Sequence, residues 1–462
     1  MEEASAYIAR NWSSTVRYAT EDQGTLIGLP RPFSTPSTSG VFQELHYWDT
    51  YFINVGLPAS GQTEQAANNI ENMFYLIDRF GWMPNGNRTF YLCRSQPPFL
   101  LQMVRELFEH TQDRAWLHAG AYPALQQEYW FWHTHRTLDN GLSRYGGEDP
   151  DDTTLRELGR SLCKRFGLAP PESPERLYPY GRAMLALAES GWDCTSRFGT
   201  EAQLYAPVDL NALLYRMEHN MEWFAGVLGL DAERSQWRSR KEFHKARMDE
   251  LLWDPERGCY CDYRFSDGHR SALFSAAAFY PLFAGMCSPE RAAQVVSMLS
   301  LLEMPYGVAC CEKTGGLLGL QWDYPNGWAC LQYIVFMALR RYEYKRDAQR
   351  IAEKYLALVD RVFQRSGQLW EKYDVCTGDI SVSKEYQTPP MMGWTAGVYT
   401  AFQEIVHPRR SGQAARSAPV PGPPRESHDP SGIPQFEIHQ VEIDIFPVDL
   451  EESRKDAQLP EA

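Results

Sequence analysis

The sequence lacks the cysteine patterns of a metal site or a disulfide framework. Its ten cysteines include no CxxC pair and no zinc-ligand spacing. Cysteines scattered in this way through a chain of 462 residues are typical of reduced thiols in a core. From this pattern we expect no bound metal, and nothing in the sequence predicts another cofactor.

The sequence also has no stripe of lysine and arginine interleaved with aromatic residues, and its net charge is −14. This balance argues against nucleic acid and anionic membranes as partners and suits a small neutral substrate. No uninterrupted apolar stretch approaches the roughly 20 residues of a membrane span. The first residues contain no basic region followed by an apolar run, so we expect no signal peptide and a cytoplasmic location.

Helical periodicity dominates what is present. Ile70, Met73, Phe74 and Ile77 form one apolar stripe, and Gly81 follows as a helix stop. The same reasoning predicts helices at 210–224, 329–340, 347–363 and 397–406. Strand signals are short, as at 259–263. The segments rich in aromatic residues, glycine and proline are expected to be loops that carry the site, namely 81–99, 140–175, 305–328 and 370–396.

The composition changes after His407. Residues 408–435 are rich in Pro, Arg, Ser and Gly, which is typical of a flexible linker. Residues 436–448 alternate partly between apolar and polar side chains and could form an added strand. We therefore expect one helical domain over residues 1–407 and a flexible linker and tail over 408–462.

Two acidic residues far apart in the sequence each follow a tryptophan, Asp193 after Trp192 and Glu371 after Trp370. An adjacent indole is an apolar wall that can keep a carboxyl group protonated near neutrality. Two such carboxylates are what hydrolysis of a glycosidic bond requires, one as acid and the other as base or nucleophile. The alternative is that each is one of 59 mostly solvated acidic residues.

Three further segments carry side chains that sugar binding would use, at 42–52, 82–99 and 320–332. Their indoles offer faces for stacking, and their amides, carboxylates and arginines can hydrogen-bond to hydroxyl groups. The alternative for each tryptophan is packing in the core. The alternative for Pro84–Gly86 is an ordinary turn.

Taken together, these segments resemble the α,α-trehalase family. Nine runs carry the resemblance in the family's order: 42–52, 84–88, 94–98, 141–145, 190–193, 207–213, 321–328, 371–374 and 393–395. The resemblance implies an all-α fold, an (α/α)6 barrel of helical hairpins whose long loops form the active site. It also implies an inverting hydrolase without metal or cofactor, with Asp193 as general acid and Glu371 as general base. The substrate-binding residues that it indicates are Trp48, Asp49, Asn85, Arg94, Ser95, Gln96, Glu172, Gly191, Trp322 and Glu385.

The sequence departs from the family pattern at three places that bear on the substrate. Val41 and Pro170 stand where family members carry arginine, and residues 381–384 replace a glycine-rich run before Glu385. A hydrogen bond from a charged donor contributes roughly 1.5–3 kcal/mol, so these changes would alter the pocket for the leaving sugar.

The sequence therefore favours hydrolysis of α,α-trehalose into two glucose molecules. The first alternative is another small glucoside, such as glucosylglycerate or a short oligosaccharide. The second alternative is a sugar-binding barrel without turnover, which the retention of both Asp193 and Glu371 disfavours.

Overall fold

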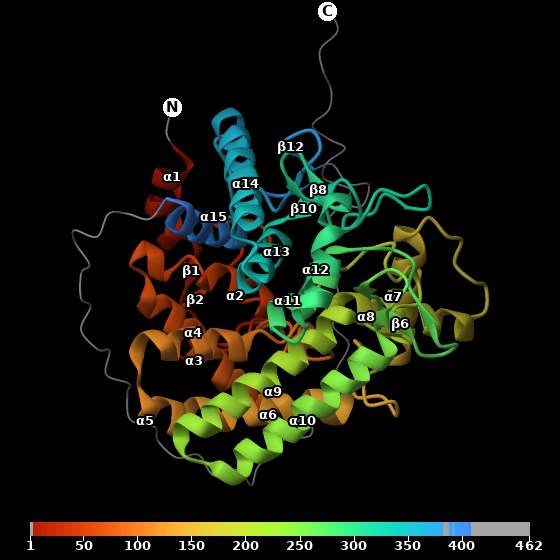
Figure 1. Ribbon diagram of the computed structural model, residues 1–462, viewed down its shortest axis with the longest axis horizontal. Coiled ribbons are helices and arrows are strands. Elements are labelled where there is room, and N and C mark those ends of the chain that lie inside the picture. Colours follow the sequence, from red (N-terminus) through yellow and green to blue (C-terminus); the bar gives the residue numbers. More distant parts are fainter. Residues whose placement is uncertain (1–2, 382–387, 391, 408–462) are drawn as a thin grey trace, which may run out of the picture. The chain divides into compact units, whose positions relative to one another are not determined.

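The computed structural model describes residues 3–381, 388–390 and 392–407. Within these residues, six helices form a closed inner ring in which each helix contacts the next. In order around the ring they are α2 (Tyr47–Asn54), α4 (Leu100–Thr111), α9 (Val208–Leu228), α11 (Tyr280–Ala284), α13 (Ala329–Arg341) and α15 (Gly393–Val406). The ring closes where α15, close to the C-terminal end of the described chain, packs against α2 (Figure 1).

Further helices alternate with the inner ones along the chain and pack outside the ring. They include α3 (Thr63–Phe80) against α4, α6 (Tyr122–His135) and α10 (Asp231–Leu251) against α9, and α14 (Lys345–Ser366) against α13 and α15. The remaining helices of this part of the fold are α1 (Ala4–Asn11), α5 (Arg114–Trp116) and α12 (Pro289–Ser297). The alternation of inner and outer helices confirms the expected (α/α)6 barrel.

The helices form where the apolar spacing predicts them. Ile70, Met73, Phe74 and Ile77 are buried on α3, and Gly81 ends that helix with φ +87° while its N–H donates to the Ile77 carbonyl. The predicted stretches at 210–224, 329–340, 347–363 and 397–406 lie inside α9, α13, α14 and α15.

The expectation that 140–175 is one loop is wrong, because α7 (Asp152–Arg165) lies inside it. The Asp151 carboxylate caps this helix by accepting from the N–H groups of Thr153 and Thr154. A buried stripe that includes Leu155 and Leu158 packs against α8 (Tyr178–Ser190). Together α7 and α8 form an insertion between α6 and α9 in the sequence. Helix α8 ends just before the segment that carries Asp193.

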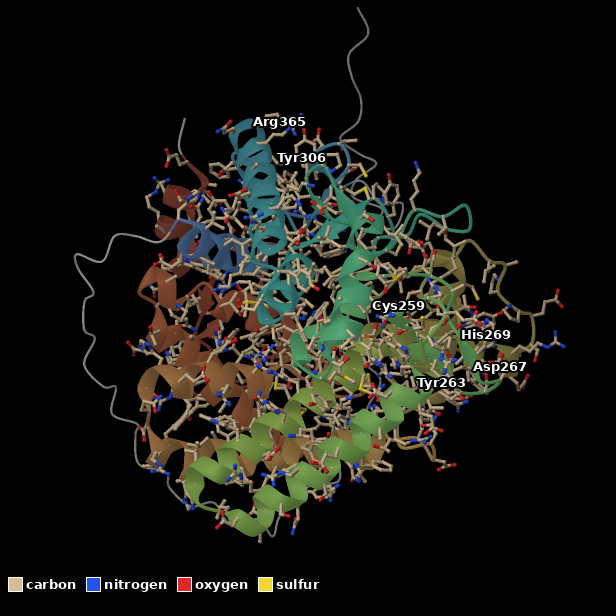
Figure 2. The ribbon with its side chains drawn as sticks, viewed as in Figure 1. Cys259, Tyr263, Asp267, His269, Tyr306 and Arg365 are labelled. Atoms are coloured by element: carbon tan, nitrogen blue, oxygen red, sulfur yellow. The ribbon has the colours of Figure 1, made fainter. Side chains whose placement is uncertain are left out.

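The strands are short and antiparallel. They are β1 (Val16–Arg17) with β2 (Phe33–Ser34), β3 (Tyr205–Ala206) with β6 (Tyr263–Arg264) and β7 (His269–Arg270), β4 (Trp253–Asp254) with β5 (Cys259–Tyr260), β8 (Glu303–Met304) with β9 (Gly307–Val308), and β10 (Asn326–Trp328) with β11 (Lys372–Asp374) and β12 (Asp379–Ile380). The expected single strand at 259–263 is instead divided between β5 and β6, which pair with different partners. Figure 2 shows Tyr263, Asp267 and His269 of the β6–β7 hairpin close together, well away from Arg365 near the end of α14.

The contact between α2 and α15 is unusually close, since a Cβ atom added at Gly397 would lie 1.9 Å from the carbonyl oxygen of Phe52. Only glycine allows the two backbones to approach in this way.

None of the described helices is long and apolar enough to cross a membrane. Glu385 and the predicted linker and tail at 408–462 lie outside the described residues, so the domain boundary stays a prediction.

Candidate active site

Asp193 lies just beyond the C-terminal end of α8. Gly191 ends that helix with φ +71°, and a Cβ atom at this position would lie 2.6 Å from Cζ2 of Trp48. The glycine is therefore required for two reasons, the left-handed backbone and the indole pressed against it. Gly191 thus joins the Asp193 segment to the inner helix α2, which carries Trp48.

The backbone after Asp193 is held by the 320–328 segment. The N–H of Trp322 donates to the Cys194 carbonyl at 3.0 Å. The buried Asp323 carboxylate accepts from the Ser196 N–H at 2.7 Å and from its hydroxyl at 2.6 Å. Two segments that the sequence singled out are thus tied together by charge-assisted hydrogen bonds.

A buried arginine fastens the same segment from the other side. Arg197 donates to both oxygens of Asp262 at 2.6 Å, and it also pairs with Asp209 at 2.5 Å. Its guanidinium lies 4.8 Å from the ring centroid of Trp192, next to Asp193. A buried cation paired with two carboxylates and stacked on an indole leaves the Asp193 loop little freedom.

A second buried ionic centre lies where three of the motif runs, 94–98, 141–145 and 190–193, come together. The fully buried Glu189 carboxylate accepts from the N–H groups of Ser95 and Gly146 at 2.9 and 2.7 Å. It also accepts from Nε and Nη2 of Arg136 at 2.8 and 2.9 Å. The Ser95 hydroxyl donates to the Met83 carbonyl at 2.6 Å, so Ser95 contributes to the loop structure here. Sequence reasoning missed Glu189 and Arg136.

Glu371 immediately precedes β11 and is buried. Its backbone is fixed at both ends, since its N–H donates to the Pro389 carbonyl and its carbonyl accepts from the Trp394 indole at 3.1 Å. One carboxylate oxygen, Oε2, accepts from Nζ of the adjacent Lys372 at 2.6 Å. The candidate base is therefore oriented by an inner helix, a loop and its own neighbour.

The candidate acid and base lie close enough for the charge of one to affect the pKa of the other. Burial, with smaller contributions from the nearby charges of Glu371 and Asp49, raises the pKa of the half-buried Asp193 carboxyl to about 7, although Arg165 and Arg94 oppose the rise. Burial likewise raises the pKa of Asp49 to about 6, with Glu371 adding to that rise. The structure therefore brings together three carboxylates and the buried Arg94, all of them expected site residues, and adds Arg165.

Several expected sugar-binding residues are interlocked at the start of α2. Nε of Arg94 donates to Oδ1 of Asn85 at 3.1 Å, and Oε1 of Gln96 accepts from the Trp48 N–H at 3.3 Å. The Asn85 carbonyl accepts from the N–H of Tyr47 at 2.9 Å. Residues 84–86 are consequently more than an ordinary turn, because they fix the amide and guanidinium groups beside the first helix of the ring.

The tryptophans of the site pack mainly against one another. The rings of Trp322 and Trp328 stack with centroids 3.9 Å apart, while Trp48 and Trp192 lie 5.7 and 5.1 Å from Trp322. Trp48 and Trp322 are each only 2% exposed. Most of the surface of these indoles is therefore buried against other side chains, as the alternative of core packing predicts. In this position they give the site a rigid apolar wall.

Two other residues depart from the expected list. Glu172 is exposed in the connection between α7 and α8, and no contact among the described residues links it with Asp193 or Glu371. Arg165, which the sequence did not suggest, donates from Nη1 to the Cys194 sulfur at 3.8 Å and influences Asp193. It was missed because it ends α7, in a segment interpreted as loop.

Within the described ranges, no cluster of three or more His, Cys, Asp or Glu side chains has a metal-binding arrangement.

Comparison with known proteins gives a consistent result. A family model described as Trehalase matches residues 1–406. The periplasmic trehalase of Pseudomonas aeruginosa is 34% identical over 430 residues, which cover 87% of this chain and 76% of the relative. That of Xanthomonas oryzae pv. oryzae is 36% identical over 421 residues, covering 86% and 71%.

Solved structures agree with the sequence relatives. The neutral trehalase Nth1 from Saccharomyces cerevisiae matches with a TM-score of 0.70 and 26% identity, covering 88% of this chain and 80% of that one. A mannosylglycerate hydrolase from Thermus thermophilus matches with a TM-score of 0.58 and 18% identity, covering 86% of this chain and 99% of that one. At this low identity the second match supports the fold alone.

The comparisons correct one expectation. The cytoplasmic location is wrong, since the curated relatives from Pseudomonas, Xanthomonas and Salmonella are named periplasmic trehalases. The expectation rested on the pattern of the first residues, and the remaining sequence features, charge, hydropathy and scattered thiols, reflect how a chain folds and do not assign its compartment.

Proposed function

We propose that this chain, which belongs to the trehalase family, hydrolyses α,α-trehalose into two glucose molecules with inversion at the anomeric carbon. One observation of the structure carries the proposal. Asp193 has its pKa raised to about 7, and Glu371, whose charge contributes to that rise, is ion-paired to a lysine. A proton donor and a second carboxyl group paired with a cation are the two groups that an inverting glycosidase uses.

In the proposed reaction, Asp193 donates its proton to the glycosidic oxygen as the bond to the anomeric carbon breaks. Glu371 accepts a proton from a water molecule whose oxygen attacks that carbon from the opposite face. The products are two glucose molecules, with Asp193 ionised and Glu371 protonated until proton exchange with solvent restores both. The partial withdrawal of Asp193 from water keeps it protonated near neutral pH, as a general acid must be.

Further residues are proposed to hold the sugar hydroxyls. Asp49, Asn85, Arg94 and Gln96 supply a carboxylate, two amides and a guanidinium that the start of α2 and the loop between α3 and α4 keep in place. The Arg94–Asn85 hydrogen bond and the Trp48–Gln96 hydrogen bond fix three of these side chains before substrate binds, which lowers the entropy lost on binding.

The substrate is a small sugar, and we propose that it is neutral. The net charge of −14 and the absence of a basic stripe are the reasons to propose no nucleic acid and no membrane as partners. The names of the curated relatives point to the periplasm as the place where the chain acts.

A glucoside with an anionic leaving group, such as glucosylglycerate, is the second candidate substrate. The observation that favours it is Arg165, a cation beside the general acid in a chain with Val41 and Pro170 where family members carry arginine. A guanidinium on the leaving-group side would pair with a carboxylate in a fork geometry.

A panel of α-linked disaccharides and glucosides, each assayed for released glucose, tests the proposal. We expect trehalose to give the highest kcat/KM. Glucosylglycerate as the better substrate would replace the first candidate with the second. Release of glucose from no member of the panel would refute the proposed function.

A further inference from the structure

Lys372 is a completely buried lysine in contact with the candidate general base. Its Nζ donates to Oε2 of Glu371 at 2.6 Å, and the two side chains are 0% and 5% exposed. An ammonium group withdrawn from water is strongly destabilising unless a counter-charge compensates it. The chain nevertheless places this lysine directly after Glu371, inside the site.

The fold determines where the ammonium group lies. Lys372 begins β11, and its backbone is paired with that of Trp328 in β10. Its Nζ lies 4.8 Å from the ring centroid of Trp328, which also stacks on the indole of Trp322. The lysine is therefore held between an indole face and a carboxylate, with little freedom to turn away from Glu371.

The charges around Glu371 explain what such a lysine does. Asp193, beyond α8, and Asp49, on α2, are the acidic groups that interact electrostatically with Glu371. On the positive side, Arg94 and Arg165 act on Asp193, and His46 acts on Asp49. Neighbouring carboxylates favour protonation of one another, and a base that carries a proton cannot accept one from water.

We propose that Lys372 is a positioning residue that keeps Glu371 ionised and fixes its Oε2 during the reaction, an inference that rests on the proposed role of Glu371 as base. The lysine transfers no proton and touches no substrate atom, and it acts only through the Glu371 carboxylate. It opposes the acidic neighbours of Glu371 while those same neighbours help Asp193 to stay protonated, so that one site holds an ionised and a protonated carboxyl group at the same pH.

The pH profile of kcat/KM for trehalose tests this role. Lys372→Met removes the charge and keeps the length of the side chain, so the acidic limb should move to higher pH by about 1–2 units, as expected when an opposite charge within about 4–6 Å is lost. Lys372→Arg keeps the charge and should leave that limb within about half a unit. Lys345→Met is the matched control, because it removes an exposed ion pair of 2.5 Å to Glu343 and should change nothing.

A purely structural role for Lys372 gives a different result. In that case Lys372→Met lowers the melting temperature or the yield, and the folded fraction keeps the wild-type acidic limb, which would overturn the inference. If Lys372→Met does not fold, Lys372→Arg decides, since a shift of a full unit with the charge retained would also overturn it. A wild-type protein that releases no glucose refutes the proposed function, whereas an active wild type with an unshifted Lys372→Met refutes the role of Lys372 alone.

Discussion

Glu189→Gln tests whether the buried ionic centre behind the active site controls both stability and activity. Each oxygen of Glu189 accepts from one backbone N–H and one N–H of Arg136. A glutamine amide in either orientation would point its NH2 group at two donors and leave the Arg136 charge without a buried partner. Removing one member of a buried ion pair typically costs about 3–5 kcal/mol of unfolding free energy.

The same arginine provides a matched control. Arg136 also pairs with Glu148 at 3.3 Å, but the Glu148 side chain is 51% exposed. Glu148→Gln should therefore cost at most about 1 kcal/mol. Both variants remove one negative charge beside one guanidinium, so the difference between them measures burial rather than charge.

Urea denaturation and steady-state kinetics measure the two consequences. We expect Glu189→Gln to lower the unfolding free energy by several times the loss in Glu148→Gln. We also expect a fall in kcat/KM of about 10²-fold for Glu189→Gln, because the Ser95 loop and the end of α8 lose their common anchor and misplacement near 1 Å can cost that much. Equal losses for the two variants would refute the reasoning.

Four further outcomes are expected. Asp193→Asn and Glu371→Gln should each lower kcat by roughly 10²–10⁴-fold in folded protein, and retention of a tenth of the activity would remove that residue from its role. Because the acid must be protonated, kcat/KM should fall as pH rises through the Asp193 pKa of about 7, and a profile flat to about pH 9 would contradict this. NMR of freshly released sugar should show β-glucose first, which requires the carboxyl groups of Asp193 and Glu371 to be roughly 6.5–9.5 Å apart, and an initial α-anomer would exclude inversion. Deletion of residues 408–462 should leave activity and melting temperature nearly unchanged, and a loss of more than a few degrees would show that the domain boundary is wrong.

Much of the fold follows from spacing that a sequence displays. The stripe from Ile70 to Ile77 predicts a helix buried on one face, because its apolar residues recur at helical spacing. The apolar run at 329–340 predicts a helix buried on all sides. The closed ring is different, since it depends on contacts between helices hundreds of residues apart, and only the family resemblance indicated it. Helix α7 was missed because its polar composition and the prolines around it conceal a stripe that includes Leu155 and Leu158.

In the site, too, some residues could be predicted from the sequence and others could not. Asp193 and Glu371 could be found because a carboxyl beside a tryptophan suggests a particular chemistry. Glu189, Arg136 and Lys372 could not, because a buried charge and a solvated one look alike in a sequence. Glu189 and Arg136, for example, are 53 positions apart, and their pairing depends on the fold that brings α8 to the end of α6.

The closure of the ring by α15 against α2 determines when, during synthesis and folding of the chain, activity can first appear. Trp394, on α15, supports Glu371 and contacts Trp48 on α2, so the working site joins the earliest and latest parts of the barrel. A chain still being made contains Trp48, Asp49 and Asp193 but not the helix that completes their surroundings. Catalysis is therefore expected only after the last helix of the barrel has been synthesised and docked, and a chain truncated before residue 393 should be inert although it retains both proposed catalytic carboxyl groups.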